Sequence, residues 1–308
     1  DRVIEDAGDD ADRRYRILPP DLADWDAFAP FWQAETLRAV PPKVRARVRR
    51  RLLLDILLEF GLQSRLGRTL ELTGSVVAGV AEPDTVLLAA AKAALGEVRT
   101  PKDAELLTWV TGVLERMRTR GAIHHDWFER YQIEDGKRYS IWGGRRRADG
   151  APAFPKGRPA PAYPRTGGSK VDHGLDPVAH PQAWYAQSAA RTHHQTHTER
   201  PILPRLMQVH LASQDLLSKL NSGSGAQIYH LKPDQVVVHS ADPEALTAGD
   251  LAVECTTCQS VTPGLAASVR HLVGAPCLVV RCAGVLRRKP LGDNFYRRLY
   301  SASDARRV

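Results

Sequence analysis

Cysteine is scarce in this chain of 308 residues, which has only four, and none of them lies outside positions 255–282. The start of the sequence is acidic and has no apolar core, so it does not resemble a secretory signal. No apolar run approaches the roughly 20 residues that a membrane-spanning helix needs. These absences predict a cytoplasmic protein without a membrane partner, in a compartment where structural disulfides are rare.

The four cysteines form two short pairs, Cys255-Thr-Thr-Cys258 and Cys277-Leu-Val-Val-Arg-Cys282, which are separated by eighteen residues. Paired short spacings of this kind are typical of zinc knuckles, and four thiolates match a tetrahedral structural site. We therefore predict one structural Zn²⁺ held by these four residues. Two disulfides in a secreted protein, or free thiols, are the alternatives that the spacing leaves open. A closed four-thiolate site has no open position, so we predict no catalytic role for it.

Charge is distributed unevenly along the chain. The net charge is +8, yet residues 1–40 hold ten acidic and five basic residues, so the remainder carries about +13. A basic body behind an acidic leader favours a polyanionic partner, with DNA, duplex or single-stranded, as the first candidate. Ordinary solubility in an arginine-rich organism is the simpler alternative.

The predicted fold class is α+β and multidomain. Four regions are expected: an acidic leader and helical part with a basic helix at 42–61 (1–100), a winged-helix-like segment with a Pro/Gly-rich connector (101–180), a second winged-helix-like domain (181–243), and a zinc module with a basic aromatic tail (244–308). Helices are also expected at 84–97, 101–121, 181–192 and 199–215. Strands are expected at 69–73, 76–80 and 139–142, as a hairpin over 216–231, and from 236 onward.

Two histidines precede an acidic residue at His124-His125-Asp126. Together they suggest either a metal site or a polar helix cap. Adjacent histidines point in different directions, so a cap or turn is favoured.

Clusters of arginine mark the predicted nucleic-acid contacts. The expected phosphate-binding residues are Arg45, Arg49 and Arg50 on the long helix, Arg145, Arg146 and Arg147 in the connector, and Arg287, Arg288, Arg297 and Arg298 after the zinc module. The last group lies among the aromatic residues Phe295, Tyr296 and Tyr300, a combination that suits stacking on a flexible strand. A solvated helix face, pairing with the acidic leader, or docking of the arginines on a neighbouring protein lobe are the alternatives.

The zinc-module sequence and its aromatic–arginine continuation, Asn294-Phe-Tyr-Arg-Arg-Leu-Tyr300, resemble a known group. They are similar to large bacterial DEAD/DEAH-box helicases of superfamily 2, many of which are encoded near phage-defence or DNA-modification genes. Leu57–Arg65 and Arg68–Gly74 are also similar to that group. The resemblance implies an accessory, DNA-contacting region between two motor lobes, with those lobes or a companion defence protein as partners.

The motor motifs themselves are absent from the sequence. It has no Walker A loop and no DEAD or DEAH box, so ATP and Mg²⁺ belong only to the presumed parent protein. The chain is expected to be a fragment of that protein and to have no ATPase activity alone. A stand-alone zinc-ribbon and winged-helix regulator or adaptor is the alternative.

Overall fold

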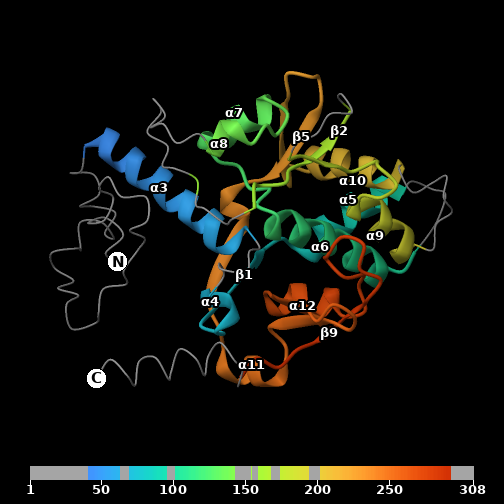
Figure 1. Cartoon of the computed structure of the whole chain (residues 1–308). Coiled ribbons are helices and arrows are strands. Elements are labelled where there is room, and N and C mark those ends of the chain that lie inside the picture. Colours follow the sequence, from blue (N-terminus) through green and yellow to red (C-terminus); the bar gives the residue numbers. More distant parts are fainter. Residues whose placement is uncertain are drawn as a thin grey trace, which may run out of the picture.

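The structure is a computed structural model that describes residues 41–62, 69–95, 101–142, 154, 159–167, 174–193 and 202–292. It is a mixed α/β arrangement of helices around several small sheets (Figure 1). Among the described residues, no helix has the length and apolar character needed to cross a membrane. The predicted acidic leader, Arg145–Arg147 of the connector and the aromatic tail with Arg297 and Arg298 lie outside the described residues.

Helix α6 (Asp103–Thr119) is the centre of the molecule (Figure 1). Its apolar side chains Leu106, Trp109, Val110 and Met117 are all buried, so the helix is covered on most sides. Strand β1 (Val76–Val80) packs against it, as do three helices and one strand of another sheet. These neighbours are α5 (Asp84–Leu95), α9 (Trp184–Thr192), α12 (Ala266–Leu272) and β5 (Gln227–Leu231). Helix α10 (Ile202–Ser213) packs on α5 and α9 at the same side of the core.

The strands form three small sheets. Strand β1 (Val76–Val80) pairs antiparallel with β6 (Val236–Ser240). A second sheet has the order β3-β2-β5-β4, and the third, in the zinc module, has the order β8-β7-β9. The remaining bounds are β2 (Pro164–Thr166), β3 (Asp176–Pro177), β4 (Leu217–Asn221), β7 (Ala252–Cys255), β8 (Val261–Pro263), β9 (Leu286–Arg288), the 3₁₀ turn η3 (Pro233–Gln235) and α11 (Pro243–Ala248).

One continuous group of buried apolar residues runs from Leu54 to Leu286. It draws on each of the four predicted regions, because a small sheet or single helix cannot cover its own apolar face. The predicted domain boundaries stay a prediction.

The long basic helix is confirmed as α3 (Pro42–Phe60). Proline suits its first turn, and the backbone N–H of Gly61 donates to the Leu57 carbonyl at 2.9 Å where the helix ends. A side chain at Gly61 would lie 2.7 Å from Ile123, so only glycine allows this close approach. The C-terminal half of α3 is anchored in the core through Leu54, Leu57 and Leu58, whereas its N-terminal half extends away from the body (Figure 1).

A buried ion-pair network joins α6 to the zinc module. Arg118 is fully buried and donates to Glu115 at 2.7 Å and to Glu71 at 3.2 Å. It also donates to the carbonyls of Phe60 at 2.7 Å and Pro263 at 3.2 Å, so it links the end of α3 and strand β8. Burial alone would lower the pKa of Arg118, but the two carboxylates outweigh that effect and raise it.

Two expected strands are helices instead. Thr69–Leu72 forms α4, because Glu71 is drawn into the core by Arg118 rather than alternating towards solvent. Tyr139–Trp142 forms the single turn α8, which follows α7 (Asp126–Ile133) and its left-handed termination at Asp135 and Gly136.

The winged-helix expectation is not confirmed in either region. No two-stranded wing forms over the described residues 123–142, where α7 and α8 are found. The hairpin β4–β5 is present as predicted, but β6 leaves it to pair with β1. The helices expected near 84–97, 101–121, 181–192 and 199–215 are confirmed with slightly different bounds.

Candidate metal centre

The four cysteines meet at one end of the β8-β7-β9 sheet. Cys255 ends β7 and Cys258 lies in the following turn, whereas Cys277 and Cys282 come from the loop between α12 and β9. Their Sγ atoms all lie within 4.8 Å of one another. The pairs Cys255–Cys282 and Cys258–Cys277 are each 3.6 Å apart.

These distances fit a metal better than disulfides. A disulfide joins two sulfurs at about 2.05 Å, and all four thiols are free in the structure. A tetrahedral zinc site with Zn–S bonds of about 2.3 Å places its sulfurs about 3.8 Å apart. The four side chains therefore converge on a volume that one tetrahedral ion would fill.

Backbone amides turn towards the sulfurs in both knuckles. The N–H of Thr257 donates to Cys255 Sγ at 3.4 Å, and that of Val279 donates to Cys277 Sγ at 3.4 Å. The N–H of Gly284 donates to Cys282 Sγ at 3.5 Å. Such outer bonds stabilise thiolate charge and fix the direction of each ligand.

Gly284 is the tightest position of the centre. A Cβ atom there would lie 2.3 Å from Cys255 Sγ and 2.8 Å from the hydroxyl of Thr257. The Gly284 carbonyl also accepts a hydrogen bond from the N–H of Cys277 at 3.0 Å. The absence of a side chain therefore lets the two knuckles approach each other.

The thiols of the centre have divergent pKa values. Partial burial acts to raise the pKa of Cys258, but hydrogen bonds from Ser260 and the nearby thiols bring it down to about 6. Burial raises the pKa of Cys277. For Cys282 the bond from the Gly284 amide acts to lower the pKa, yet burial and the thiols of Cys255 and Cys258 raise it overall. Loading the centre with a metal must therefore displace protons, which makes metal affinity fall in acid.

Three side chains from the helical body hold the second knuckle in place. Arg191 of α9 donates to the carbonyls of Cys282, Ala283 and Gly284 at 3.0, 2.8 and 2.8 Å. The indole N–H of Trp184 donates to the Cys277 carbonyl at 2.8 Å, and Arg116 donates to the Leu278 carbonyl at 2.7 Å. Sequence reasoning missed these anchors, because their partners are main-chain carbonyls about 90 or more residues away.

Two of the predicted nucleic-acid contacts are engaged with acidic neighbours. Arg287 lies 3.0 Å from Glu254, which Lys289 also contacts at 2.8 Å, and Arg288 pairs with Asp250. The hydrogen bond from Lys289 is the main reason why the pKa of Glu254 is lowered. The strand β9 therefore presents charge that is largely neutralised at short range. The prediction that its arginines contact nucleic acid remains a prediction.

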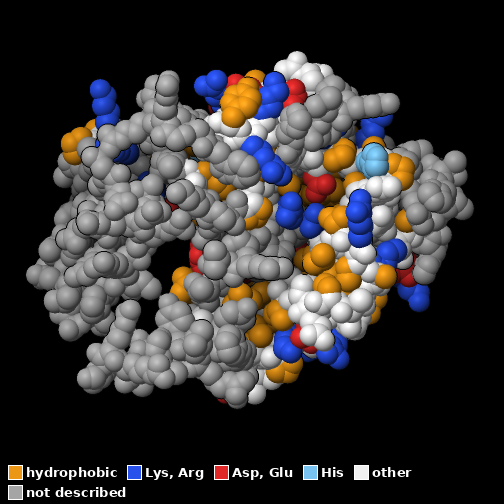
Figure 2. Space-filling view, viewed as in Figure 1, with side chains coloured by type: hydrophobic (Ala, Val, Ile, Leu, Met, Phe, Trp, Pro, Cys, Tyr) orange, Lys and Arg blue, Asp and Glu red, His pale blue; other side chains and the backbone are white. Residues whose placement is uncertain are grey.

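The basic residues of α3 are arranged differently. Lys43, Arg47 and Arg49 are exposed, and no acidic group of the described residues pairs with them. Arg50 is half-buried and lies 3.2 Å from Asp126. The helical position of Arg45 is described, but its side chain is not. On the face shown in Figure 2, Lys and Arg side chains form separate groups, and several of them have acidic side chains nearby.

No family model, curated protein or solved structure matches this chain. A functional assignment therefore has to rest on the residues and their geometry.

Proposed function

We propose that this chain is a zinc-stabilised, DNA-contacting module that serves as the accessory region of an ATP-dependent bacterial helicase acting in phage defence or DNA processing. The observation that carries the DNA-binding part is the projecting half of α3, where Lys43, Arg47 and Arg49 are exposed and pair with no acidic group of the described residues. The zinc centre supports a structural role, because four thiolates leave no coordination position for a substrate.

One side of α3 carries positively charged residues in its N-terminal half and apolar residues in its C-terminal half. Lys43, Arg47 and Arg50 are spaced by four and three residues, so they lie on one side of the helix. The same side continues through Leu54 and Leu57, which are buried in the core. Towards the N-terminus of α3 the residues on this side are cations, and none of them belongs to the apolar core of the described residues. A projecting cationic stripe of this kind suits a phosphate backbone.

A salt titration of DNA binding tests this proposal. Affinity for single- and double-stranded DNA is measured by fluorescence anisotropy for the wild type and for Lys43→Ala/Arg47→Ala. If both cations contact phosphates, the slope of log affinity against log salt falls by about 1.4 for single strands and about 1.8 for duplex.

The matched control is Arg287→Ala/Arg288→Ala, which removes the same charge from residues that already have acidic partners. We expect a smaller change of slope for this pair. Absence of binding at low salt, or equal losses from both pairs, would contradict the assignment to α3. A loss seen only with the control pair would move the contact to β9.

The helicase part of the proposal is supported by the resemblance of the zinc module and its aromatic–arginine continuation. It predicts that the chain alone does not hydrolyse ATP, with or without DNA, and that helicase motor motifs of the second lobe follow Val308 in the coding sequence. ATP turnover that persists through purification and copurifies with the chain would contradict it.

A stand-alone regulator or adaptor with the same parts is the second candidate. The large continuous apolar cluster from Leu54 to Leu286 favours it, because such a core can support an independently folded unit. A coding sequence that lacks motor motifs would support this candidate over the helicase.

A further inference from the structure

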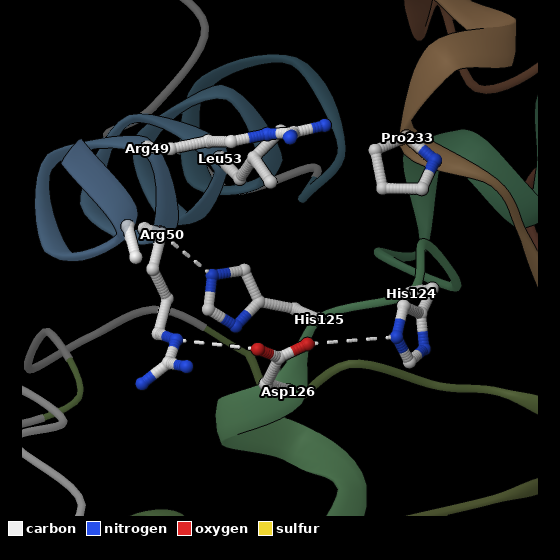
Figure 3. Close-up of a pocket in the computed structure, with 8 residues that line it drawn as sticks. Arg49, Arg50, Leu53, His124, His125, Asp126 and Pro233 are labelled. Carbon is white, nitrogen blue, oxygen red and sulfur yellow. Dashed lines mark hydrogen bonds and ion pairs between the residues drawn. The ribbon is translucent and has the colours of Figure 1, made fainter. Parts of the chain in front are cut away.

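A pocket of about 340 Å³ lies between the projecting part of α3 and the start of α7 (Figure 3). Helix α3 contributes Arg49, Arg50 and Leu53, and the opposite wall is formed by His124, His125 and Asp126, with Pro233 at one side. The two walls come from segments that are more than 70 residues apart in the sequence, so only the fold brings them together.

His125 has a structural task at this pocket. Its Nδ1 accepts a hydrogen bond from the backbone N–H of Trp127 at 3.1 Å, which makes it the N-cap of α7 as the sequence favoured. Its Nε2 therefore carries the proton and donates to the carbonyl of Arg50 at 2.9 Å. Both ring nitrogens are occupied, so His125 is no metal ligand here.

The neighbouring polar groups converge without satisfying one another. His124 Nε2 lies 3.7 Å from Asp126 Oδ1 and 3.9 Å from Glu129 Oε1, and the three ligand atoms all lie within 4.8 Å of each other. These separations are too long for hydrogen bonds. Ligands bound to one ion at about 2.1 Å in tetrahedral geometry lie about 3.4 Å apart. The two distances from His124 Nε2 exceed this value by a few tenths of an ångström, and the two carboxylate oxygens lie within 4.8 Å of each other, so the side chains would close around a bound ion.

The ligand atoms are also held from behind. Arg50 lies 3.2 Å from Asp126 Oδ2, so the other carboxylate oxygen, Oδ1, is left facing His124 (Figure 3). The backbone N–H of His124 donates to the Leu231 carbonyl at 2.8 Å, which fixes the segment that carries the imidazole. Asp126 and Glu129 are three residues apart on α7 and thus share a face of that helix. Support of a ligating carboxylate by a second group is characteristic of metal sites.

We propose that His124, Asp126 and Glu129 bind a divalent transition-metal ion beside this pocket. One imidazole and two carboxylates suit Mn²⁺, Fe²⁺ or Zn²⁺. Three protein ligands leave coordination positions for water or another ligand, in contrast to the closed four-cysteine centre. The inference does not depend on the DNA-binding proposal.

The test is a Mn²⁺ titration of the full chain with its cysteine centre loaded with zinc. Thiolates bind Mn²⁺ poorly, so the cysteine centre does not interfere. Loss of the electron paramagnetic resonance signal of free Mn²⁺ reports binding. We expect one Mn²⁺ per chain, displaced by added Zn²⁺ in line with the usual affinity order. His124→Ala and Glu129→Gln should each weaken binding by about tenfold or more.

The control is Glu105→Gln, which removes an exposed carboxylate from the first turn of α6 and should leave Mn²⁺ affinity unchanged. The proposal is overturned if neither Mn²⁺ nor a second equivalent of Zn²⁺ binds at millimolar concentration. It is equally overturned if the ligand variants and Glu105→Gln bind alike, since an adventitious surface ion would give that result. Circular dichroism of each variant distinguishes ligand loss from unfolding of α7.

Discussion

Replacing Gly284 with alanine tests the close approach of the two zinc knuckles. The added Cβ would lie 2.3 Å from Cys255 Sγ and 2.9 Å from Thr257 Cβ. Ordinary contacts between heavy atoms lie at roughly 3.5–4.0 Å, so Cys255 or the backbone must move by more than about 1 Å. Movement of Cys255 would pull one ligand out of the tetrahedron, and movement of the loop would break the Gly284–Cys277 hydrogen bond.

The size of the effect follows from the cost of overpacking. Forcing one extra carbon into a packed site costs about 1–3 kcal/mol. Since about 1.4 kcal/mol corresponds to tenfold in affinity, Gly284→Ala should weaken zinc binding by roughly five- to 150-fold. Binding of a structural zinc ion and folding of the module are linked, so the cost of overpacking should be measurable as a lower affinity for zinc.

The assay is competition with a chromophoric zinc chelator at neutral pH. The matched control is Gly264→Ala in the same module, where the nearest atom to the added Cβ is 3.8 Å away. Cys277→Ser, which removes a ligand outright, sets the scale of full loss. Equal zinc affinities for Gly284→Ala and Gly264→Ala would refute the argument that this close contact shapes the centre.

Two further predictions concern stability. Arg118→Met should lower the free energy of unfolding by about 3–5 kcal/mol, because it removes the buried positive charge that lies between the carboxylates of Glu115 and Glu71. Urea denaturation measures the loss. The control is Arg270→Met at an exposed position, whose free energy of unfolding should stay within about 0.5 kcal/mol of the wild type. An equally small change for Arg118→Met would contradict the stabilising role of the network. Burial, and then the neighbouring His124, lowers the pKa of His230 to about 3. The unfolded state therefore takes up a proton first as pH falls, and stability drops from about pH 6.5 towards 3, by up to about 1.4 kcal/mol per pH unit. As the pH is lowered from 7 to 5, the wild type should lose stability relative to His230→Phe, which has no imidazole to protonate. A stability difference that does not change with pH would contradict this.

Local patterns predicted the helices well. The prolines at 41–42 and the glycine at 61 bound α3, and the apolar repeat from Leu106 to Met117 identifies α6, because caps and a 3.6-residue period are local properties. The same locality accounts for the four candidate metal ligands. The cysteines come in two pairs that are close in the sequence, Cys255 with Cys258 and Cys277 with Cys282. Both pairs can therefore be recognised before the fold is known.

The strand predictions failed where a distant partner decides the conformation. Thr69–Leu72 reads as an alternating strand, yet Arg118 holds Glu71 inside the core and the segment is helical. Strand β6 was expected from position 236 onward, but the sequence did not indicate that it pairs with β1 about 160 residues earlier. Pairing between strands is non-local, so the residue pattern within one strand does not identify the strand with which it pairs.

The sequence by itself determined the four metal ligands, the long basic helix and the cap at His125, since each depends on residues within a few positions of one another. Only the tertiary structure decided which charges remain available. It paired Arg287 and Arg288 with acids on neighbouring segments, and within the part of the chain that the structure describes it gave Arg47 and Arg49 no such partner. It also placed Arg50 behind Asp126, more than 70 residues away, and so oriented that carboxylate towards His124. The energy of a charge depends on what surrounds it in space, and that information is absent from the local sequence.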